Sequence, residues 1–305
     1  RLLSLMSKPG KPFDPKRFGA LLRTKELGRA CRYTPLATSS MDVADKLLDQ
    51  ENIPHGSVVV VDSQTKGRGR NNRSWSSQNV SNLYFSLILH PTSIEEILSV
   101  NFAAPLAVAM AAQTCGVKDP KVKWPNDVWV KSRKFAGILL NTTARNSKLE
   151  GSLGVGYTVN LGIGVNINQD MAEAKSVSSG EATSIVMENG NVQIEREAFL
   201  AEVCENLESL AMLSRVGLMK KYEKYDMLVG NDIIVMPNKK EDPTSYYDAK
   251  AVGYSKSGYL LVKLPDGNIK TLSAEEVSIR PGGYYETRKK YEEVSDTKKS
   301  LKGSS

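Results

Sequence analysis

Two apolar runs that flank a long polar segment constrain the fold of this chain most strongly. Residues 58–61 form a β-branched run, and residues 82–89 (NLYFSLIL) form a second apolar stretch. Runs of this length and type are typical of buried strands, so we predict two strands of one sheet. The segment between them, residues 63–81, is polar and contains glycine, and a loop of that size is usually functional or disordered. It is therefore the first place to look for a site.

The rest of the first 229 residues adds more strands than helices. Residues 122–130 and 134–143 flank a short polar turn, and residues 156–168 form another apolar run that glycine interrupts. These runs predict a sheet with few helical crossovers. Helical spacing of apolar residues is found in three stretches: 41–50, which follows Ser39 and Ser40 as candidate N-caps, 94–115, and 194–225.

Two changes of pattern suggest the domain organisation. From residue 231 onward the chain carries short apolar runs separated by turn-rich segments, which predicts a small barrel-like β domain. Residues 1–30 show no strong period and are expected to be an extension or linker. We therefore predict an N-terminal extension at 1–30, a larger main domain at 31–229, a small β domain at 230–283 and a charged tail at 284–305.

Composition excludes several classes of protein. The 305 residues include three cysteines and two histidines. The cysteines are odd in number and widely spaced, which argues against a disulfide framework and for a reducing compartment, and neither histidine has a partner at metal-ligand spacing. No apolar run approaches the roughly 18 residues that span a bilayer. We expect a cytoplasmic protein, and the first residue, Arg rather than Met, leaves an upstream organellar targeting segment open.

The net charge of +7 suits a nucleic-acid binder, a protein with an anionic ligand, or a solvated surface with a basic tail. Part of the excess lies in the terminal stretches 288–290 and 298–299, which read as a solvated helix or a disordered tail. Charge alone therefore does not choose between these classes.

The most informative segment is residues 64–75, QTKGRGRNNRSW. It concentrates three arginines, a lysine and two glycines between two predicted strands, so the backbone can approach a ligand while fixed cations face it. Such a loop suits phosphate. It is not a dinucleotide-binding fingerprint, because Asn72 holds the third glycine position and a strand follows, and it is not a Walker loop. By itself it also fits an RGG-like nucleic-acid loop or a solvated hairpin tip.

Two further segments carry unusual residues. Residues 123–127 (KWPND) end one predicted strand and residues 134–139 (KFAGIL) begin the next, so a hairpin would bring Lys123, Asp127 and Lys134 together. A surface hairpin with incidental charges remains an alternative. Residues 160–168 (NLGIGVNIN) contain glycines two apart in a strand, which indicates close approach of a ligand or of a packed helix.

Four blocks in this order and spacing resemble the biotin protein ligase family, also called holocarboxylase synthetase. The blocks are residues 64–75 (QTKGRGRNNRSW), 123–130 (KWPNDVWV), 134–140 (KFAGILL) and 161–166 (LGIGVN). The resemblance runs from about residue 35 to about residue 281. It implies an α+β fold: a mixed or antiparallel sheet flanked by helices, as in class II synthetase-like catalytic domains, followed by a small SH3-like barrel, without an N-terminal DNA-binding domain.

The resemblance also implies a two-step reaction. The carboxylate of biotin attacks the α-phosphate of ATP to give biotinyl-5′-AMP and pyrophosphate, and a lysine of a biotin carboxyl carrier domain then attacks the mixed anhydride. Two negative charges about 4 Å apart repel by about 1 kcal/mol in water and about 4 kcal/mol at an effective dielectric of 20, so the site must neutralise them. Mg²⁺ is expected with ATP, because this hard cation prefers oxygen ligands and bound phosphates.

Carried over position by position, the resemblance assigns roles in the reaction to three residues. Lys134 would bridge the carboxylate and the α-phosphate, and Arg68 and Arg70 would close the loop over the adenylate. As a fourth catalytic residue we hypothesise Asp127, which would assist the acceptor amine. The implied biotin-binding residues are Ser39, Ser40, Gln64, Gly67, Arg68, Lys134, Gly137, Gly162 and Gly164. The implied ATP-binding residues are Arg70, Arg73, Trp75, Lys123, Asn126, Asp127, Lys134 and Asn166, with Asp127 and Asn166 as the Mg²⁺ candidates. The chain departs from the family at Met41, where an asparagine is common, so the role of that position stays open.

Three alternatives remain. A lipoate ligase or lipoyl/octanoyl transferase would share the sheet and the lysine, but such families usually have consecutive glycines after an arginine-rich segment, which this chain lacks. A basic nucleic-acid-binding protein would show steep salt dependence. A DNA-binding repressor needs a winged helix, for which about 35 residues are too few. We expect carrier domains as partners, no DNA, no membrane, and a monomer or homodimer.

Overall fold

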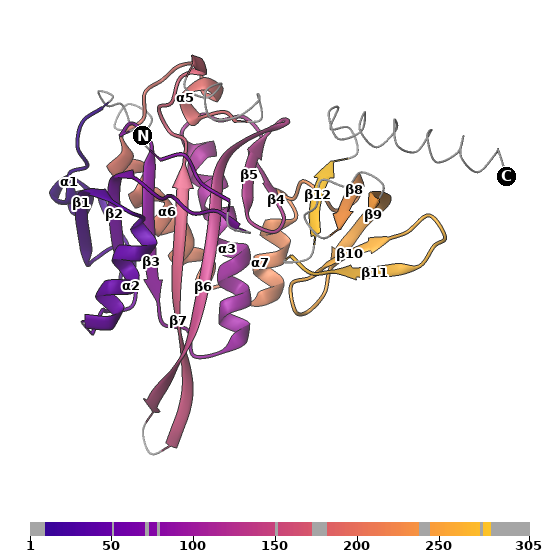
Figure 1. Cartoon of the computed structure of the whole chain (residues 1–305), viewed down its shortest axis with the longest axis horizontal. Coiled ribbons are helices and arrows are strands. Elements are labelled where there is room, and N and C mark those ends of the chain that lie inside the picture. Colours follow the sequence, from indigo (N-terminus) through magenta and orange to yellow (C-terminus); the bar gives the residue numbers. More distant parts are fainter. Residues whose placement is uncertain are drawn as a thin grey trace. The chain divides into compact units, whose positions relative to one another are not determined.

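The structure, a computed structural model, describes residues 10–50, 52–70, 73–77, 80–149, 152–172, 182–237, 245–274 and 277–281 (Figure 1). The chain divides into two compact units. The first contains Arg1–Val122 and Asn126–Tyr225, and the second contains Lys123–Pro125 and Asp226–Ser305. The division falls slightly before the expected boundary at 229, and part of the KWPND block groups with the second unit. The charged tail expected at 284–305 lies outside the described residues.

The first unit is built on a seven-stranded mixed sheet with the order β1-β2-β3-β7-β6-β5-β4. β1 and β2 are parallel, whereas the β2–β3, β3–β7, β7–β6 and β6–β5 pairs are antiparallel. The strands are β1 (Cys31–Ala37), β2 (Ser57–Gln64), β3 (Leu83–Leu89), β4 (Lys121–Lys123), β5 (Asp127–Val130), β6 (Arg133–Leu149) and β7 (Ser152–Val165). With the helices around it, this sheet confirms the predicted α+β fold (Figure 1).

The described part of the first unit also contains helices, of which α5 (Ile185–Glu188) is the shortest. The others are α1 (Pro15–Leu21), α2 (Ser40–Gln50), α3 (Ile94–Thr114), α6 (Arg196–Ala211) and α7 (Arg215–Tyr222). α2 packs on β2, β3 and β7, whereas α3 packs on β5, β6 and α6. Among the described helices, α3 alone is long and apolar enough to cross a membrane, yet 56% of that stretch is buried within the protein. α3 thus contributes to the core of this unit.

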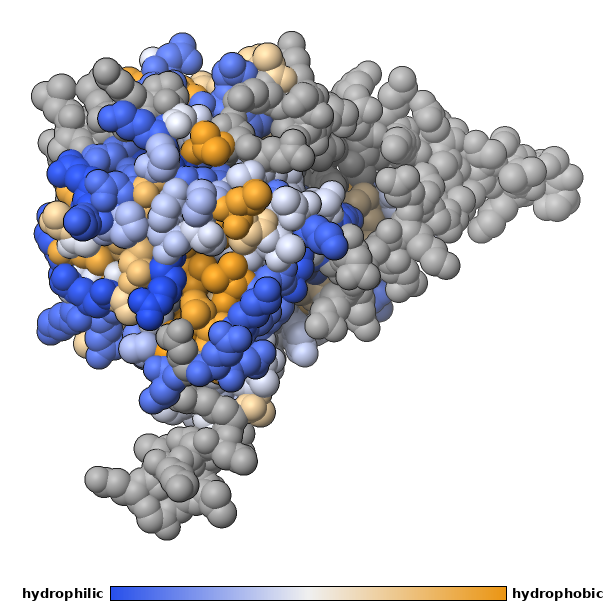
Figure 2. Space-filling model, turned by 60° about the vertical axis from the view of Figure 1, so that its left-hand side comes forward, coloured by the Kyte–Doolittle hydropathy of each residue, from blue (hydrophilic) through white to orange (hydrophobic). Residues whose placement is uncertain are grey.

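Several large apolar side chains are exposed on the described surface of the first unit. The view in Figure 2 is mainly hydrophilic, with smaller apolar patches between the polar residues. The exposed large apolar side chains of this unit come from several elements: Leu36, Val80, Ile94, Met171, Met212 and Val216. Single apolar residues of this kind are normal on protein surfaces and mark no site by themselves.

Residues 10–30 are not the linker that the sequence suggested. Phe13, Phe18 and Leu27 are buried, and Asp14 caps α1 by accepting hydrogen bonds from the backbone N–H groups of Lys16 and Arg17. α1 packs against α6. The buried side chains come from turns and one short helix, so they have neither a 2.0 nor a 3.6 residue period, and pattern analysis did not detect them.

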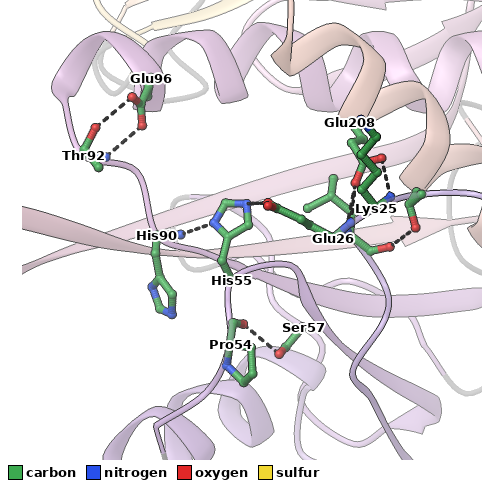
Figure 3. Close-up of polar contacts among 11 residues, drawn as sticks. Lys25, Glu26, Pro54, His55, Ser57, His90, Thr92, Glu96 and Glu208 are labelled. Atoms are coloured by element: carbon green, nitrogen blue, oxygen red, sulfur yellow. Dashed lines mark hydrogen bonds and ion pairs between the residues drawn. The ribbon is translucent and has the colours of Figure 1, made fainter.

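Glu208 of α6 holds this N-terminal segment through its carboxylate. That group accepts hydrogen bonds from the backbone N–H groups of Lys25, Glu26 and Leu27, at 2.7, 2.8 and 3.1 Å (Figure 3). Partial burial by itself would raise the pKa of Glu208, but the three backbone donors outweigh it and lower that pKa below its ordinary value. The charged form of Glu208 is therefore the one that fits the folded protein.

This linkage predicts that acid loosens residues 25–27. A carboxylate whose pKa is lowered by folding contributes fully to the stability of the folded state when the pH is above its unfolded pKa of about 4.3. That contribution is lost as the pH falls through the lower pKa of the folded state. We expect hydrogen exchange of these three amides to increase relative to the core as the pH falls below about 4.3. Glu208→Gln should exchange fast at neutral pH already, whereas the exposed control Glu223→Gln should not. Unchanged protection in Glu208→Gln would contradict this role.

The two histidines lie next to each other near the same segment. The backbone N–H of His90 donates to Nδ1 of His55 at 3.0 Å, and the ring centroids are 6.3 Å apart (Figure 3). Nε2 of His90 lies 2.8 Å from the carbonyl oxygen of Ile53. In the part of the chain that the structure describes, no three His, Cys, Asp or Glu side chains are grouped to hold a metal ion.

The second unit is a five-stranded antiparallel sheet with the order β11-β10-β9-β8-β12. Its strands are β8 (Asp232–Pro237), β9 (Tyr247–Tyr254), β10 (Leu260–Lys263), β11 (Ile269–Leu272) and β12 (Val277–Pro281). The first four match the expected short runs. Trp124 belongs to this unit, where its indole N–H donates to the carbonyl oxygen of Gly258 at 3.1 Å. This contact accounts for the tryptophan of the KWPND block.

Candidate functional site

The candidate site lies where the basic loop and α2 meet the sheet at its glycines. Gly137 and Gly164 are opposite each other on β6 and β7. A Cβ on Gly164 would lie 2.6 Å from Nε1 of Trp75, and one on Gly162 would lie 2.5 Å from the sulfur of Met41. Both distances are too short for a real contact, so a side chain at either position would force Trp75 or Met41 to shift. Met41 of α2 thus fits the packed-helix interpretation of Gly162, while the loop covers Gly164 and Gly137.

The described part of the basic loop folds back on itself. The N–H of Trp75 donates to the carbonyl oxygen of Gly67 at 2.9 Å, and the N–H of Gly69 donates to that of Arg73 at 2.8 Å. A Cβ on Gly67 would lie 2.3 Å from the carbonyl oxygen of Trp75, so the turn requires glycine there. The indole nitrogen of Trp75 is buried without a hydrogen-bond partner among the described residues.

A buried polar cluster lies at the base of the loop. Oε1 of Gln64 accepts a hydrogen bond from the backbone N–H of Ser40 at 2.8 Å, and Nε2 of Gln64 donates to Oγ of Ser77 at 2.7 Å. Ser86 donates from its hydroxyl to Oγ of Ser40 at 2.9 Å, and Oγ of Ser39 accepts from the N–H of Met41. All five polar side chains are buried. Three of them were predicted from the sequence, and the structure brings these three together.

Sequence analysis missed Ser77 and Ser86. Ser86 is a single hydroxyl in the otherwise apolar run of β3, which is a signal that a buried polar partner exists. Ser77 follows the basic loop and offers no comparable signal, because serine is common in loops. Their contacts with Ser40 and Gln64 place both in the same polar cluster.

Lys134 and Asp127 form the expected pair across the β5–β6 hairpin. Nζ of Lys134 lies 2.6 Å from Oδ1 of Asp127, with 28% and 20% of these side chains exposed. The same Nζ lies 4.9 Å from the ring centroid of Trp75, within range of a cation–π contact. Lys134 therefore connects the hairpin to the loop. Lys123, the buried last residue of β4, belongs to the second unit, and its part in ATP binding stays a prediction.

The arginines of the loop point to different partners. Nη1 of Arg70 donates to Oδ1 of Asn126 at 3.2 Å, and Nδ2 of Asn126 donates to the carbonyl oxygen of Ile138 at 2.6 Å. Nη2 of Arg68 lies 2.8 Å from Oδ1 of Asp42 on α2. Arg73 is exposed. Arg70 is thus joined to the hairpin and Arg68 to α2.

Asn166 has a structural contact that the sequence did not indicate. Its Nδ2 donates to the carbonyl oxygen of Thr183 at 3.0 Å, and its backbone N–H donates to that of Phe135 at 2.8 Å. The side chain is buried and holds the segment before α5 against the sheet. Its expected role beside Mg²⁺-ATP, like that of Asp127, stays a prediction.

The arrangement combines two kinds of recognition. Buried hydroxyl and amide groups can hydrogen-bond a neutral polar ring, which would otherwise cost about 1–3 kcal/mol for each unpaired group. Lys134, Arg68 and Arg70 come from the neighbouring hairpin and loop and can neutralise anionic groups. The chemistry that fits is activation of a carboxylate by a phosphate ester.

Comparison with known proteins gives one family. Residues 33–157 match the model of the biotin/lipoate A/B protein ligase family. The bifunctional ligase/repressor BirA of Bacillus subtilis is 28% identical over 89% of this chain and 80% of its own length. Biotin–protein ligase 2 of Arabidopsis thaliana is 27% identical over 87% of this chain and 79% of its own length. The structure of biotin protein ligase from Aquifex aeolicus in complex with biotin and ATP matches 83% of this chain and 99% of its own, at 26% identity and a TM-score of 0.64.

Proposed function

We propose that the chain is a biotin–protein ligase of the biotin/lipoate A/B protein ligase family, which forms biotinyl-5′-AMP and passes biotin to a lysine of a carrier domain. The observation that carries the proposal is the buried Gln64, Ser40 and Ser77 cluster beside the Lys134 hairpin. It offers both groups that the substrate needs, polar partners for a ureido ring and a cation for a carboxylate.

In the first step the chain's own residues bind and orient two anions. Gln64 and the serines hold the ring, and the glycines of β6 and β7 let the ligand approach the sheet backbone. Lys134 neutralises the carboxylate and the α-phosphate as they meet, and Arg68 and Arg70 cover them from the loop. Mg²⁺ enters with ATP as part of the substrate, and the carboxylate of Asp127 and the amide oxygen of Asn166 are of the type that it prefers.

In the second step an acceptor lysine attacks the mixed anhydride and must lose a proton. With an ordinary pKa of about 10.4, such an amine is neutral in roughly 1 of 2,500 molecules at pH 7. Asp127 accepts this proton in our proposal, supported by its place beside Lys134 on the hairpin. The adenylate's AMP is the leaving group, and an amide bond to the carrier lysine forms.

The proposed partners are biotin carboxyl carrier domains, in the cytoplasm. The BirA relatives carry a repressor function in their names, but the described residues 10–30 contain one seven-residue helix, α1, and no helix-turn-helix. Lipoate remains the competing substrate, since the family name covers both acids.

An adenylation assay separates the two acids. Purified protein with Mg²⁺-ATP and either biotin or lipoate is expected to release pyrophosphate and form an acyl-adenylate with biotin at least about 100-fold faster, because unpaired buried polar groups penalise a ligand that lacks the ureido ring. Addition of a carrier domain and an avidin blot then test transfer. Equal rates with lipoate, or no adenylate with biotin, would rule out the proposed substrate.

A further inference from the structure

α2 presents two carboxylates to the basic loop, and the reaction as proposed above does not use them. Asp42 and Asp45 are three residues apart on this helix and so share one side of it. Nη2 of Arg68 lies 2.8 Å from Oδ1 of Asp42 and 3.6 Å from Oδ2 of Asp45. Arg68 is thus held from α2 by a single nitrogen of its guanidinium group.

Asp45 is itself fixed from the sheet. Nδ2 of Asn160, on β7, donates to Oδ1 of Asp45 at 2.6 Å and to the carbonyl oxygen of Met41 at 3.0 Å. Asn160 is buried, with 3% exposed. It lies two residues before Gly162 on the same strand, so it shares the face of the sheet that Met41 covers. A chain of polar contacts therefore runs from the centre of the sheet through Asp45 to Arg68.

Backbone pairing within the basic loop couples the position of Arg68 to that of Trp75. Arg68 pairs with Ser74 in an isolated β-bridge, and the residues on either side of Arg68 are joined to Trp75 and Arg73. Fixing the Arg68 side chain therefore fixes the turn that places Trp75 over Gly137 and Gly164. Among the described residues, Nε and Nη1 of Arg68 make no ion pair or hydrogen bond, so they can face an anion.

We propose that Asp42 and Asp45 are positioning residues that hold Arg68, and with it the basic loop, for retention of the adenylate. This inference rests on the proposed function. The carboxylates act through Arg68 and do not contact the ligand. The alternative is that two acids near an anionic ligand only repel it, and this alternative predicts the opposite sign: removing the acids would slow the release of the adenylate instead of accelerating it.

The test compares release of preformed biotinyl-adenylate from wild type and from Asp42→Asn with Asp45→Asn. Asparagine keeps the size of the side chain and removes its charge. We expect release to be about tenfold faster, equivalent to roughly 1.4 kcal/mol, while adenylate formation at saturating substrate changes less than about threefold. Asp49→Asn, an exposed acid of the same helix, is the matched control. Asp42→Glu should retain most of the wild-type behaviour.

Two further measurements make the outcome decisive. In an Arg68→Ala background the double asparagine change should add nothing, because its effect passes through Arg68. Without ligand, trypsin should cleave within residues 66–75 faster in the double variant than in wild type. Release at or below the wild-type rate, or a full effect without Arg68, overturns the proposal. If wild type forms no biotinyl-adenylate, the proposed function fails, and the trypsin experiment alone tests the positioning role. Faster cleavage of the double variant than of wild type then supports that role, and equal cleavage contradicts it.

Discussion

Lys134→Ala is expected to lower the rate of biotinyl-adenylate formation by about 10²–10³-fold, equivalent to about 2.7–4 kcal/mol of transition-state stabilisation. The ammonium group lies at the start of β6, between Asp127 and the ring of Trp75. The same change should act mainly on kcat, with a smaller increase of KM for ATP.

The control for this prediction is Lys131→Ala, in the turn of the same hairpin. Its side chain is 78% exposed and lies 3.8 Å from Glu188, so its removal should leave adenylation within about twofold of wild type and cost at most about 1 kcal/mol of stability. Pyrophosphate release, measured for both variants beside thermal unfolding, separates chemistry from folding. An active Lys134→Ala enzyme with normal KM would exclude the lysine from the reaction.

The parts of the fold that the sequence predicted are those with local signals. β2 contains the apolar run 58–61, and β3 is apolar except for Ser86. Four of the five strands of the second unit are short apolar runs between turn residues, so apolar patterning and turn residues located them. The Asp127 and Lys134 pair followed from a hairpin, which is also local. Ser39, Ser40 and Gln64 came from the resemblance, and the structure places them in one cluster.

The parts that were missed depend on contacts between distant segments. The N-terminal residues looked like a linker because their partners, such as Glu208, lie more than 180 residues away in sequence. Asp42 and Asp45 were not singled out from the sequence, because only the folded loop brings Arg68 to them. Met41 departed from the family pattern, and its contact with Gly162 became visible only with the helix docked on the sheet.

Arg196→Met is expected to cost about 3–5 kcal/mol of stability in the first unit, because it leaves the buried carboxylate of Asp62 without its cation. Nη2 of Arg196 lies 2.8 Å from Oδ1 of Asp62, with 6% and 5% of these side chains exposed. The guanidinium group also donates to the carbonyl oxygens of Asn82 and Lys11, at 3.0 and 2.7 Å. It therefore joins α6 to the N-terminal segment, to β2 and to the residue just before β3.

Arg17→Ala is the matched comparison, since both arginines pair with a carboxylate at nearly the same distance. Arg17 lies 2.7 Å from Glu195, but 46% of its side chain is exposed, so solvent screening should make its loss much smaller than that of Arg196. Urea unfolding should thus separate two ion pairs that differ in burial instead of geometry.

Adding Asp62→Asn to Arg196→Met should cost less than the sum of the single changes, because the second change removes the uncompensated charge. Strict additivity, or equal losses for Arg17→Ala and Arg196→Met, would show that this buried pair does not determine the stability of the sheet beneath the site.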